Sequence, residues 1–156
     1  IPDIIITGKG LGGGMPIGAF IASFEIMNCL KENPKLGHIT TFGGHPVIAS
    51  AGLATVKEVT ESNLIEETLR KEKLIRTKFK NHPAIKEIRG RGLMLALLVG
   101  SPEIASKVIL NCLDKGLILF WLLFEGSAIR ITPPLTISDK EINEGCDLIL
   151  NELNNI

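Results

Sequence analysis

The sequence predicts an α/β fold in two parts, with a boundary near residue 83. A short β-branched run, Ile4–Thr7, is typical of a buried strand. A helical segment begins at Pro46, and proline suits the first position of a helix because the N–H there has no partner. Over residues 84–156, strand and helix patterns alternate, which indicates a small α/β unit.

The first part, residues 1–83, is expected to hold two strands and two helices. A second apolar run at Ala19–Ser23 follows a glycine-dense loop and predicts a strand. The second helix begins after Asn63, and Glu66 three residues later completes a capping-box pattern. The apolar faces are expected to consist of Val47, Ala51, Leu53, Ala54 and Val56 in the first helix, and of Leu64, Ile65, Leu69, Leu74 and Ile75 in the second. The many charges of the second helix are interpreted as a solvated surface.

The second part, residues 84–156, is expected to contain four strands. Two of them, Ile85–Arg89 and Leu93–Val99, flank Gly90-Arg91-Gly92, which indicates a tight turn. Further strands are expected at Leu117–Phe120 and Ala128–Thr132. The apolar and aromatic segment 120–127 is assigned to a core or a dimer interface rather than to a substrate pocket.

Two helices are expected between and after these strands. Ser101 caps the first, and Ser138 with Glu141 forms a full capping box before the second. Their apolar positions are Ile104, Val108, Ile109 and Cys112 in the first helix, and Ile142, Cys146, Ile149, Leu150 and Leu153 in the second. Because the third cysteine, Cys29, adds no C-x-x-C spacing, neither a disulfide framework nor a metal site is expected.

Composition excludes several classes of protein. Lys plus Arg and Asp plus Glu each number 17, so the net charge is zero and no nucleic-acid partner is indicated. The longest apolar runs, such as Gly116–Phe124, are too short to span a bilayer, and no signal-peptide pattern opens the chain. A cytoplasmic enzyme is therefore the expected class. The chain begins inside a strand pattern rather than with methionine, so we expect it to be a fragment of a longer protein.

The glycine loop after the first strand carries the most informative pattern. Gly8, Gly10 and Gly13 fit a dinucleotide fingerprint, but Pro16 and an apolar run follow where that motif must open a helix. A P-loop needs Ser or Thr after Gly-Lys, and Gly10 stands there instead. Two interpretations stay open on spacing alone. Lys9 is either incidental to a flexible turn or a nucleophile that projects into a cleft, since glycines let the backbone approach a bulky ligand.

A resemblance to a known family favours the nucleophile. The segment Pro2–Ala19 runs from a strand through Lys9 and its glycines to Pro-Ile-Gly-Ala, and it resembles the lysine segment of class III aminotransferases that depend on pyridoxal phosphate (PLP). That family includes the acetylornithine, ornithine and 4-aminobutyrate enzymes. Gly8 stands where alanine is more usual. The resemblance implies that Lys9 forms a Schiff base with PLP.

Two later segments are similar to the same family. Thr40–Pro46 resembles its Thr-Phe-Gly-Gly-Asn-Pro segment, which implies that Thr41 bonds the PLP phosphate across a dimer interface. Without the family, a simple turn before a helix explains it equally well. His45 replaces the common asparagine and is expected to be a capping or turn residue rather than a catalytic one. Arg130–Ser138 resembles the Arg-x-x-Pro-Pro-Leu segment, which implies that Arg130 binds the substrate's α-carboxylate, unless strand alternation turns it to solvent.

All 156 residues fit the family. The implied fold is the C-terminal part of the type I PLP fold: the end of a large, mainly parallel α/β domain over residues 1–83 and a small C-terminal α/β domain over residues 84–156. The implied reaction transfers an amino group between an amino acid and a 2-oxo acid, in a homodimer. Since the family's aspartate for the pyridine nitrogen, its stacking aromatic and its phosphate loop lie upstream, this chain is expected to be catalytically incomplete. A structural or interaction module, or a racemase or aminomutase on the same fold, stays open as an alternative.

Overall fold

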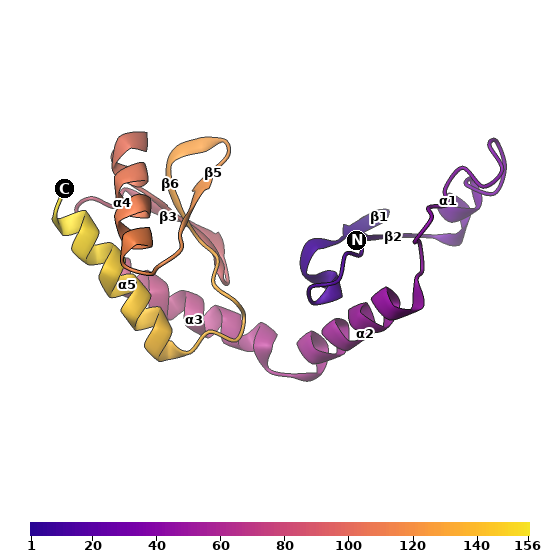
Figure 1. Cartoon of the computed structure of the whole chain (residues 1–156), viewed down its shortest axis with the longest axis horizontal. Helices are drawn as coiled ribbons and strands as arrows, with labels where there is room; N and C mark the ends of the chain where they lie inside the picture. The colour runs from indigo at the N-terminus through magenta and orange to yellow at the C-terminus, as the bar shows by residue number, and fades with distance from the viewer. The chain divides into compact units, whose positions relative to one another are not determined.

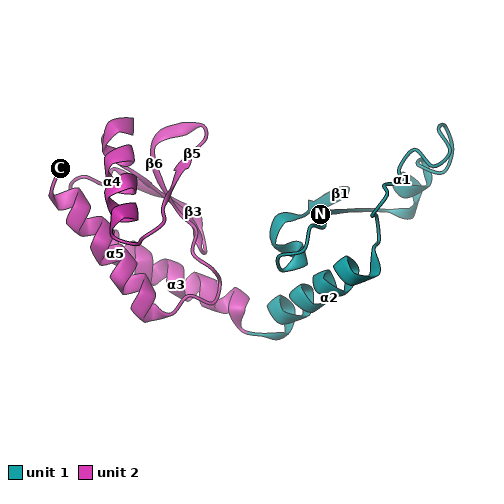
Figure 2. Cartoon of the chain, viewed as in Figure 1, with its two compact units in different colours: residues 1–62 teal, residues 63–156 magenta.

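A computed structural model describes all 156 residues, which form both strands and helices in the N-terminal and in the C-terminal part of the chain (Figure 1). The residues form two compact units, Ile1–Ser62 and Asn63–Ile156, here called unit 1 and unit 2 (Figure 2). The predicted boundary near residue 83 concerns the domains of the family and stays a prediction. In this structure the helix before residue 83 packs against the last helix of the chain, within unit 2.

Unit 1 begins with a two-stranded antiparallel sheet. Its strands, β1 (Ile4–Thr7) and β2 (Ala19–Ala22), lie where the sequence predicted strands, and Thr7 pairs with Ala19. Between them lies a single 3-10 turn, η1 (Lys9–Gly12). The prediction that the first strand is buried is wrong for this chain. Ile6 is 83% exposed, because no other strand of unit 1 joins the sheet and no helix covers β1.

Two helices complete unit 1. The short α1 (Phe24–Asn28) was not predicted, and Ser23 caps it by accepting a hydrogen bond from the Ile26 amide at 3.4 Å. The longer α2 (Pro46–Glu61) begins at the predicted proline. Its predicted apolar face is not buried in this chain, because among the other elements α2 packs mainly against η1, and Gly52 is its one buried residue. Several apolar side chains of α2 are exposed, among them Val47, Leu53 and Val56.

Unit 2 contains a four-stranded antiparallel sheet in the order β3-β4-β6-β5. The strands are β3 (Glu87–Arg91), β4 (Met94–Leu98), β5 (Phe120–Leu122) and β6 (Glu125–Ile131). The predicted hairpin is confirmed, but its turn lies at Gly92 and Leu93, because β3 continues through Arg91. Gly90 is a strand residue opposite Leu95 with a φ of +105°, and a Cβ there would overlap the Met94 carbonyl oxygen. The predicted strand Leu117–Phe120 is wrong in its limits. Pairing begins only at Phe120, because the Leu117 amide bonds the Cys112 carbonyl at the end of the preceding helix.

Three helices pack with this sheet around the core: α3 (Leu64–Phe79), α4 (Pro102–Asp114) and α5 (Asp139–Asn154). The predicted serine caps are confirmed: Ser101 accepts from the Ile104 amide, and Ser138 forms the capping box with Glu141. The fully buried side chains include Phe79, Ile75, Leu95, Leu97, Ile109, Ile129, Val99, Val108 and Cys112. None of the helices is both long enough and apolar enough to traverse a lipid bilayer.

The two buried cysteines are core residues, as predicted. Burial raises the pKa of the Cys112 thiol to about 11 and that of the Cys146 thiol to about 12. Both groups therefore stay protonated near neutral pH. Cys29 is exposed, and no disulfide forms.

Helix α3 departs from its prediction in two ways. Asn63 occupies the N-cap position, but its side chain makes no capping hydrogen bond, because its backbone (φ −86°, ψ 10°) is not extended as in capping residues. Its buried stripe consists of Lys71, Ile75 and Phe79, whereas Ile65 and Leu69 are exposed. The interpretation of its charges as a solvated surface is wrong for Lys71, which is 6% exposed.

Candidate active site

Lys9 follows β1 after a single residue, Gly8. Its φ of +49° is in the left-handed region, which disfavours residues other than glycine and asparagine. Consecutive backbone bonds hold it there, from the Leu11 amide to the Gly8 carbonyl at 3.0 Å and from the Gly13 amide to the Gly10 carbonyl at 3.1 Å. The Lys9 residue is exposed. The loop therefore presents an amine on a strained but hydrogen-bonded backbone.

The glycines of this loop have two different roles. Gly13 has a φ of +57°, and a Cβ there would lie 2.5 Å from the Thr55 hydroxyl oxygen of α2. At Gly10 and Gly14 a Cβ would meet nothing within 4 Å. Gly13 thus lets the loop approach α2, while the space around Gly10 and Gly14 is open. Because η1 is a single 3-10 turn, the loop opens no helix of the kind that a dinucleotide fingerprint requires.

Thr41 lies in the turn that leads into α2. The turn is closed by bonds from the Gly43 amide to the Thr40 carbonyl at 3.3 Å and from the His45 amide to the Phe42 carbonyl at 3.2 Å. Thr41 itself is exposed. The glycine loop that carries Lys9 contacts the side of α2, and Thr41 lies in the turn before the N-terminus of α2. Lys9 and Thr41 are thus both in segments next to the same helix. No hydrogen bond joins Lys9 to Thr41.

His45 occupies the N-cap position of α2, as its interpretation as a turn or capping residue predicts. Its side chain makes no capping bond; its carbonyl accepts from the Ala49 amide at 2.9 Å. The imidazole lies 6.4 Å from the Phe42 ring, centroid to centroid, in a tilted arrangement. His45 thus begins the helix through its backbone alone.

Arg130 lies in unit 2, one residue before the end of β6, opposite Ala96 on β4 and Phe120 on β5. Its Nε atom is buried and has no hydrogen-bond partner. The guanidinium carbon lies 4.8 Å from the centroid of the Phe120 ring, within the range of a cation–π contact. A buried N–H without a partner is unfavourable, and an anion would satisfy it. The alternative in which Arg130 points freely to solvent does not fit this buried atom.

A cavity of about 370 Å³ adjoins Arg130 within unit 2. Its walls are mainly apolar and come from strands β5 and β6, the segment after β6, and helices α3 and α5. The lining includes Phe120, Arg130, Ile131, Pro133, Pro134 and Ile149. Phe120 opens the segment 120–127, whose assignment to the core is wrong for its exposed tip residues Leu123 and Phe124. A role of that tip in an interface stays a prediction.

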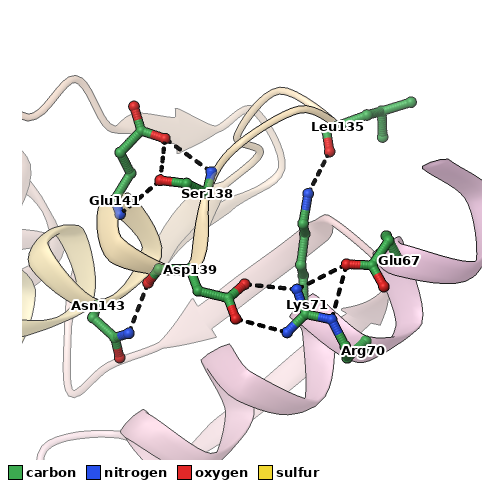
Figure 3. Close-up of polar contacts among 8 residues, drawn as sticks. All are labelled: Glu67, Arg70, Lys71, Leu135, Ser138, Asp139, Glu141 and Asn143. Carbon is green, nitrogen blue, oxygen red and sulfur yellow. Dashed lines mark hydrogen bonds and ion pairs between the residues drawn. The ribbon is translucent and has the colours of Figure 1, made fainter. Parts of the chain in front are cut away.

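Sequence reasoning missed the polar contacts that hold the segment after Arg130 (Figure 3). Lys71 Nζ donates to the Leu135 carbonyl at 2.7 Å, and Arg70 donates twice to Asp139, at 2.6 and 2.8 Å. These bonds hold the pKa of Asp139 below its usual value, mainly through Arg70. The sequence did contain one signal: Lys71 stands four residues before Ile75 and eight before Phe79, on the apolar stripe of its helix.

The comparisons with known proteins agree with this geometry. The family model described as "Aminotransferase class-III" matches residues 1–153. The chain therefore belongs to the class III aminotransferases, and the predicted family and its PLP-dependent transferase fold are confirmed.

Individual relatives show how much of the family this chain represents. It is 38% identical over 161 residues to an acetylornithine aminotransferase of Caldanaerobacter subterraneus, covering 100% of this chain and 39% of that protein. It is 39% identical to a leucine/methionine racemase of Thermococcus litoralis, covering 94% of this chain and 34% of that protein. The acetylornithine aminotransferase of Elizabethkingia anophelis has a similar structure, with a TM-score of 0.86 and 29% identity, covering 100% of this chain and 42% of that one. The chain thus spans about two fifths of these proteins or less.

Proposed function

We propose that the polypeptide to which this chain belongs is a PLP-dependent aminotransferase that transfers an amino group between an amino acid and a 2-oxo acid. The single observation that supports it most is the placement of Lys9, an exposed lysine that follows β1 after one glycine, in a glycine-rich loop. Membership of the class III family over residues 1–153 supports the same reaction class.

Unit 1 offers a group for each end of PLP: Lys9 for the aldehyde of its own cofactor, and Thr41 for the phosphate of the cofactor across the dimer interface. Lys9 supplies an amine, and the open space at Gly10 and Gly14 leaves room for a ring next to the backbone. Thr41 supplies a hydroxyl before the N-terminus of a helix, where backbone N–H groups and the helix dipole favour phosphate. When bound, PLP supplies an electron sink for bonds broken at the substrate's α-carbon.

Each candidate residue then has a defined task. Lys9 would hold the cofactor through Nζ, and the same atom would accept and return the proton of the substrate's α-carbon. Thr41 would donate a hydrogen bond from its hydroxyl to the phosphate of the cofactor held by the partner subunit. Arg130 donates from its guanidinium to the substrate carboxylate, whose charge satisfies the unpartnered Nε. Phe120, beside Arg130, keeps that guanidinium against an aromatic face.

A second subunit belongs to this proposal. Unit 1 exposes large apolar side chains on β1 and α2, including Ile6 and Leu53. Apolar surface of this extent is typical of a region that packs against further protein. We infer that residues outside this chain, and a second copy of the protein, cover these side chains in a homodimer.

A test of Lys9 uses this chain with PLP. The chain is mixed with PLP and reduced with borohydride, and the modified lysine is mapped by mass spectrometry. The expected result is one dominant adduct at Lys9, which is lost in Lys9→Ala but kept in Lys57→Ala, a matched change of an exposed lysine in the same unit. An adduct spread evenly over the surface lysines, or one unaffected by Lys9→Ala, would contradict the proposal.

Racemisation is the second candidate function, because a leucine/methionine racemase is 39% identical to this chain. A racemase also needs proton transfer at the α-carbon, so Lys9 alone does not separate the two reactions. The complete polypeptide with PLP is incubated with a single enantiomer of an amino acid, with and without a 2-oxo acid. A new amino acid formed from the 2-oxo acid supports transfer, whereas loss of optical purity without transfer supports racemisation.

A further inference from the structure

Lys71 is one of two charged residues that this chain buries; the other is Glu152. Glu152 has a cationic partner, because Lys115 and Asn111 both donate hydrogen bonds to its carboxylate. Lys71 has no carboxylate within ion-pair distance, and its Nζ bonds the Leu135 carbonyl at 2.7 Å instead. Burial of an ammonium group is unfavourable unless hydrogen bonds compensate it. The hydrogen bond to Leu135 is therefore the interaction that compensates the burial of Lys71, and it ties Lys71 to the segment that contains Leu135.

That segment, residues 132–137, connects β6 to α5 and has little structure of its own. Pro133 and Pro134 have no backbone N–H, so they donate to no neighbouring strand. One backbone bond closes the turn, from the Ile137 amide to the Pro134 carbonyl at 3.0 Å. The Lys71 ammonium therefore provides a second fixed point where the backbone itself provides few.

The far end of the segment is held by the same helix. Ser138 and Glu141 form the capping box of α5, and Asp139 accepts both hydrogen bonds of the Arg70 guanidinium (Figure 3). Arg70 and Lys71 are consecutive residues of α3, so one turn of one helix holds the segment at two points. The ion pair of Arg70 and Asp139 lies at the surface, with both side chains about half exposed, whereas Lys71 itself is buried.

The segment lies next to Arg130. Pro133 and Pro134 line the same cavity as Arg130, which stands one residue before the end of β6. The unpartnered Nε shows that no protein acceptor fixes the guanidinium at that atom. Its orientation then depends on packing against Phe120 and the walls of the cavity, and a displaced Pro133-Pro134 turn changes those walls.

We propose that Lys71 is a positioning residue for Arg130: its ammonium group holds the Leu135 carbonyl, fixes segment 132–137 and thereby orients the Arg130 guanidinium toward a substrate carboxylate. The proposal rests on the function proposed above for Arg130. Lys71 touches neither substrate nor cofactor in this scheme and acts through the segment alone.

The test observes the Arg130 Nε–H signal of the ¹⁵N-labelled chain by NMR, with Arg130→Met as the assignment control. Lys71→Met keeps the length and apolar stem of the side chain but removes its charge and its donor. Lys73→Met makes the same change at an exposed lysine of the same helix. The expected result is a shifted Arg130 signal in Lys71→Met and an unchanged one in Lys73→Met. Propionate, added as a simple carboxylate, should bind Arg130 about fivefold more weakly in Lys71→Met, while Lys71→Arg stays within about twofold of the original chain.

The outcomes separate this proposal from the one on which it rests. A folded Lys71→Met variant with the original Arg130 signal and the original propionate affinity would overturn the positioning role. If propionate leaves the Arg130 signal of the unmodified chain unchanged while Lys71→Met still shifts it, the carboxylate role fails and the positioning role stands. Should Lys71→Met not fold, Lys71→Gln, which keeps a donor without the charge, takes its place, and it should shift the Arg130 signal relative to the original chain. No shift in a folded Lys71→Gln variant would also overturn the role of the charge.

Discussion

Unit 1 and unit 2 differ most in what they bury. Every large apolar side chain that the chain buries belongs to unit 2, whereas the buried residues of unit 1 are two glycines, Gly12 and Gly52. Yet unit 1 carries Lys9 and Thr41, the candidates for the cofactor. The difference teaches that the parts of a site can reside on a segment whose own residues form no hydrophobic core, while the stability of the chain comes from another segment.

The largest effect is expected from truncation in the unit 2 core. Ile129 is fully buried, so Ile129→Ala should lower the free energy of unfolding by about 2–5 kcal/mol. Leu53, 57% exposed on α2, is the matched position in unit 1, and Leu53→Ala should change it by less than about 0.5 kcal/mol. Urea denaturation followed by circular dichroism measures both. Equal losses would show that unit 1 contributes a core of its own.

Two glycines sharpen the same comparison. Gly90 has a φ of +105°, and a Cβ would overlap the Met94 carbonyl, so Gly90→Ala should destabilise the hairpin of unit 2 by more than about 1 kcal/mol. The added methyl group of Gly10→Ala in unit 1 meets open space, so this change should alter the free energy of unfolding by less than about 0.5 kcal/mol. If Gly90→Ala leaves the free energy of unfolding unchanged in the same urea series, the hairpin relaxes around the added methyl group more easily than its backbone contacts indicate.

Removal of an N-cap side chain is expected to lower stability by less than Ile129→Ala or Gly90→Ala does. Ser138 accepts from the Glu141 amide, and Ser138→Ala should lower stability by about 1 kcal/mol. Asn63 makes no capping bond through its side chain, so Asn63→Ala should be almost neutral although the sequence pattern is equally good. Thermal unfolding of the two variants side by side decides between sequence pattern and geometry. Equal losses in both would favour the pattern.

The smallest effect is expected from a single buried carboxylate. Hydrogen bonds from Lys115 and Asn111 hold the pKa of Glu152 below its usual value, so its contribution to stability is present above the pKa of the unfolded carboxyl, about 4.3, and is lost as pH falls through the folded value. The hydrogen bond with Glu152 in turn raises the pKa of Lys115, so the contribution of Lys115 to stability is lost only at strongly alkaline pH. Urea midpoints measured from pH 7 down to pH 3 should fall more steeply for the original chain than for Glu152→Gln. Parallel pH profiles would remove Glu152 as a source of acid sensitivity.

Much of the fold followed from local patterns in the sequence. The serine caps of α4 and α5, the proline start of α2 and the glycine hairpin are set by residues within a few positions, and each was predicted. The five-residue α1 was not, because so short a helix shows little periodicity. The burial of Lys71 and the exposure of Ile6 depend on what packs against each residue, and this information is not local.

The candidate site also combines features that local sequence predicts with features that depend on distant residues. Lys9, Thr41 and Arg130 stood in motifs of the sequence, and the structure adds the left-handed backbone of Lys9 and the unpartnered Nε of Arg130. Their roles toward PLP and substrate stay proposals. Lys71 belongs to no motif, because its partner is a backbone carbonyl 64 residues away, and a backbone carbonyl has the same chemistry at every residue.

The backbone of Lys9 has a consequence for how this segment can evolve. A φ of +49° disfavours every L-residue with a β-carbon, and glycine adopts it without strain. Lys9→Gly is therefore expected to stabilise the loop while it removes the amine proposed to hold PLP. Mutation and selection for thermal stability alone would drift toward glycine at this position, and the role proposed for Lys9 would account for a lysine here despite that drift.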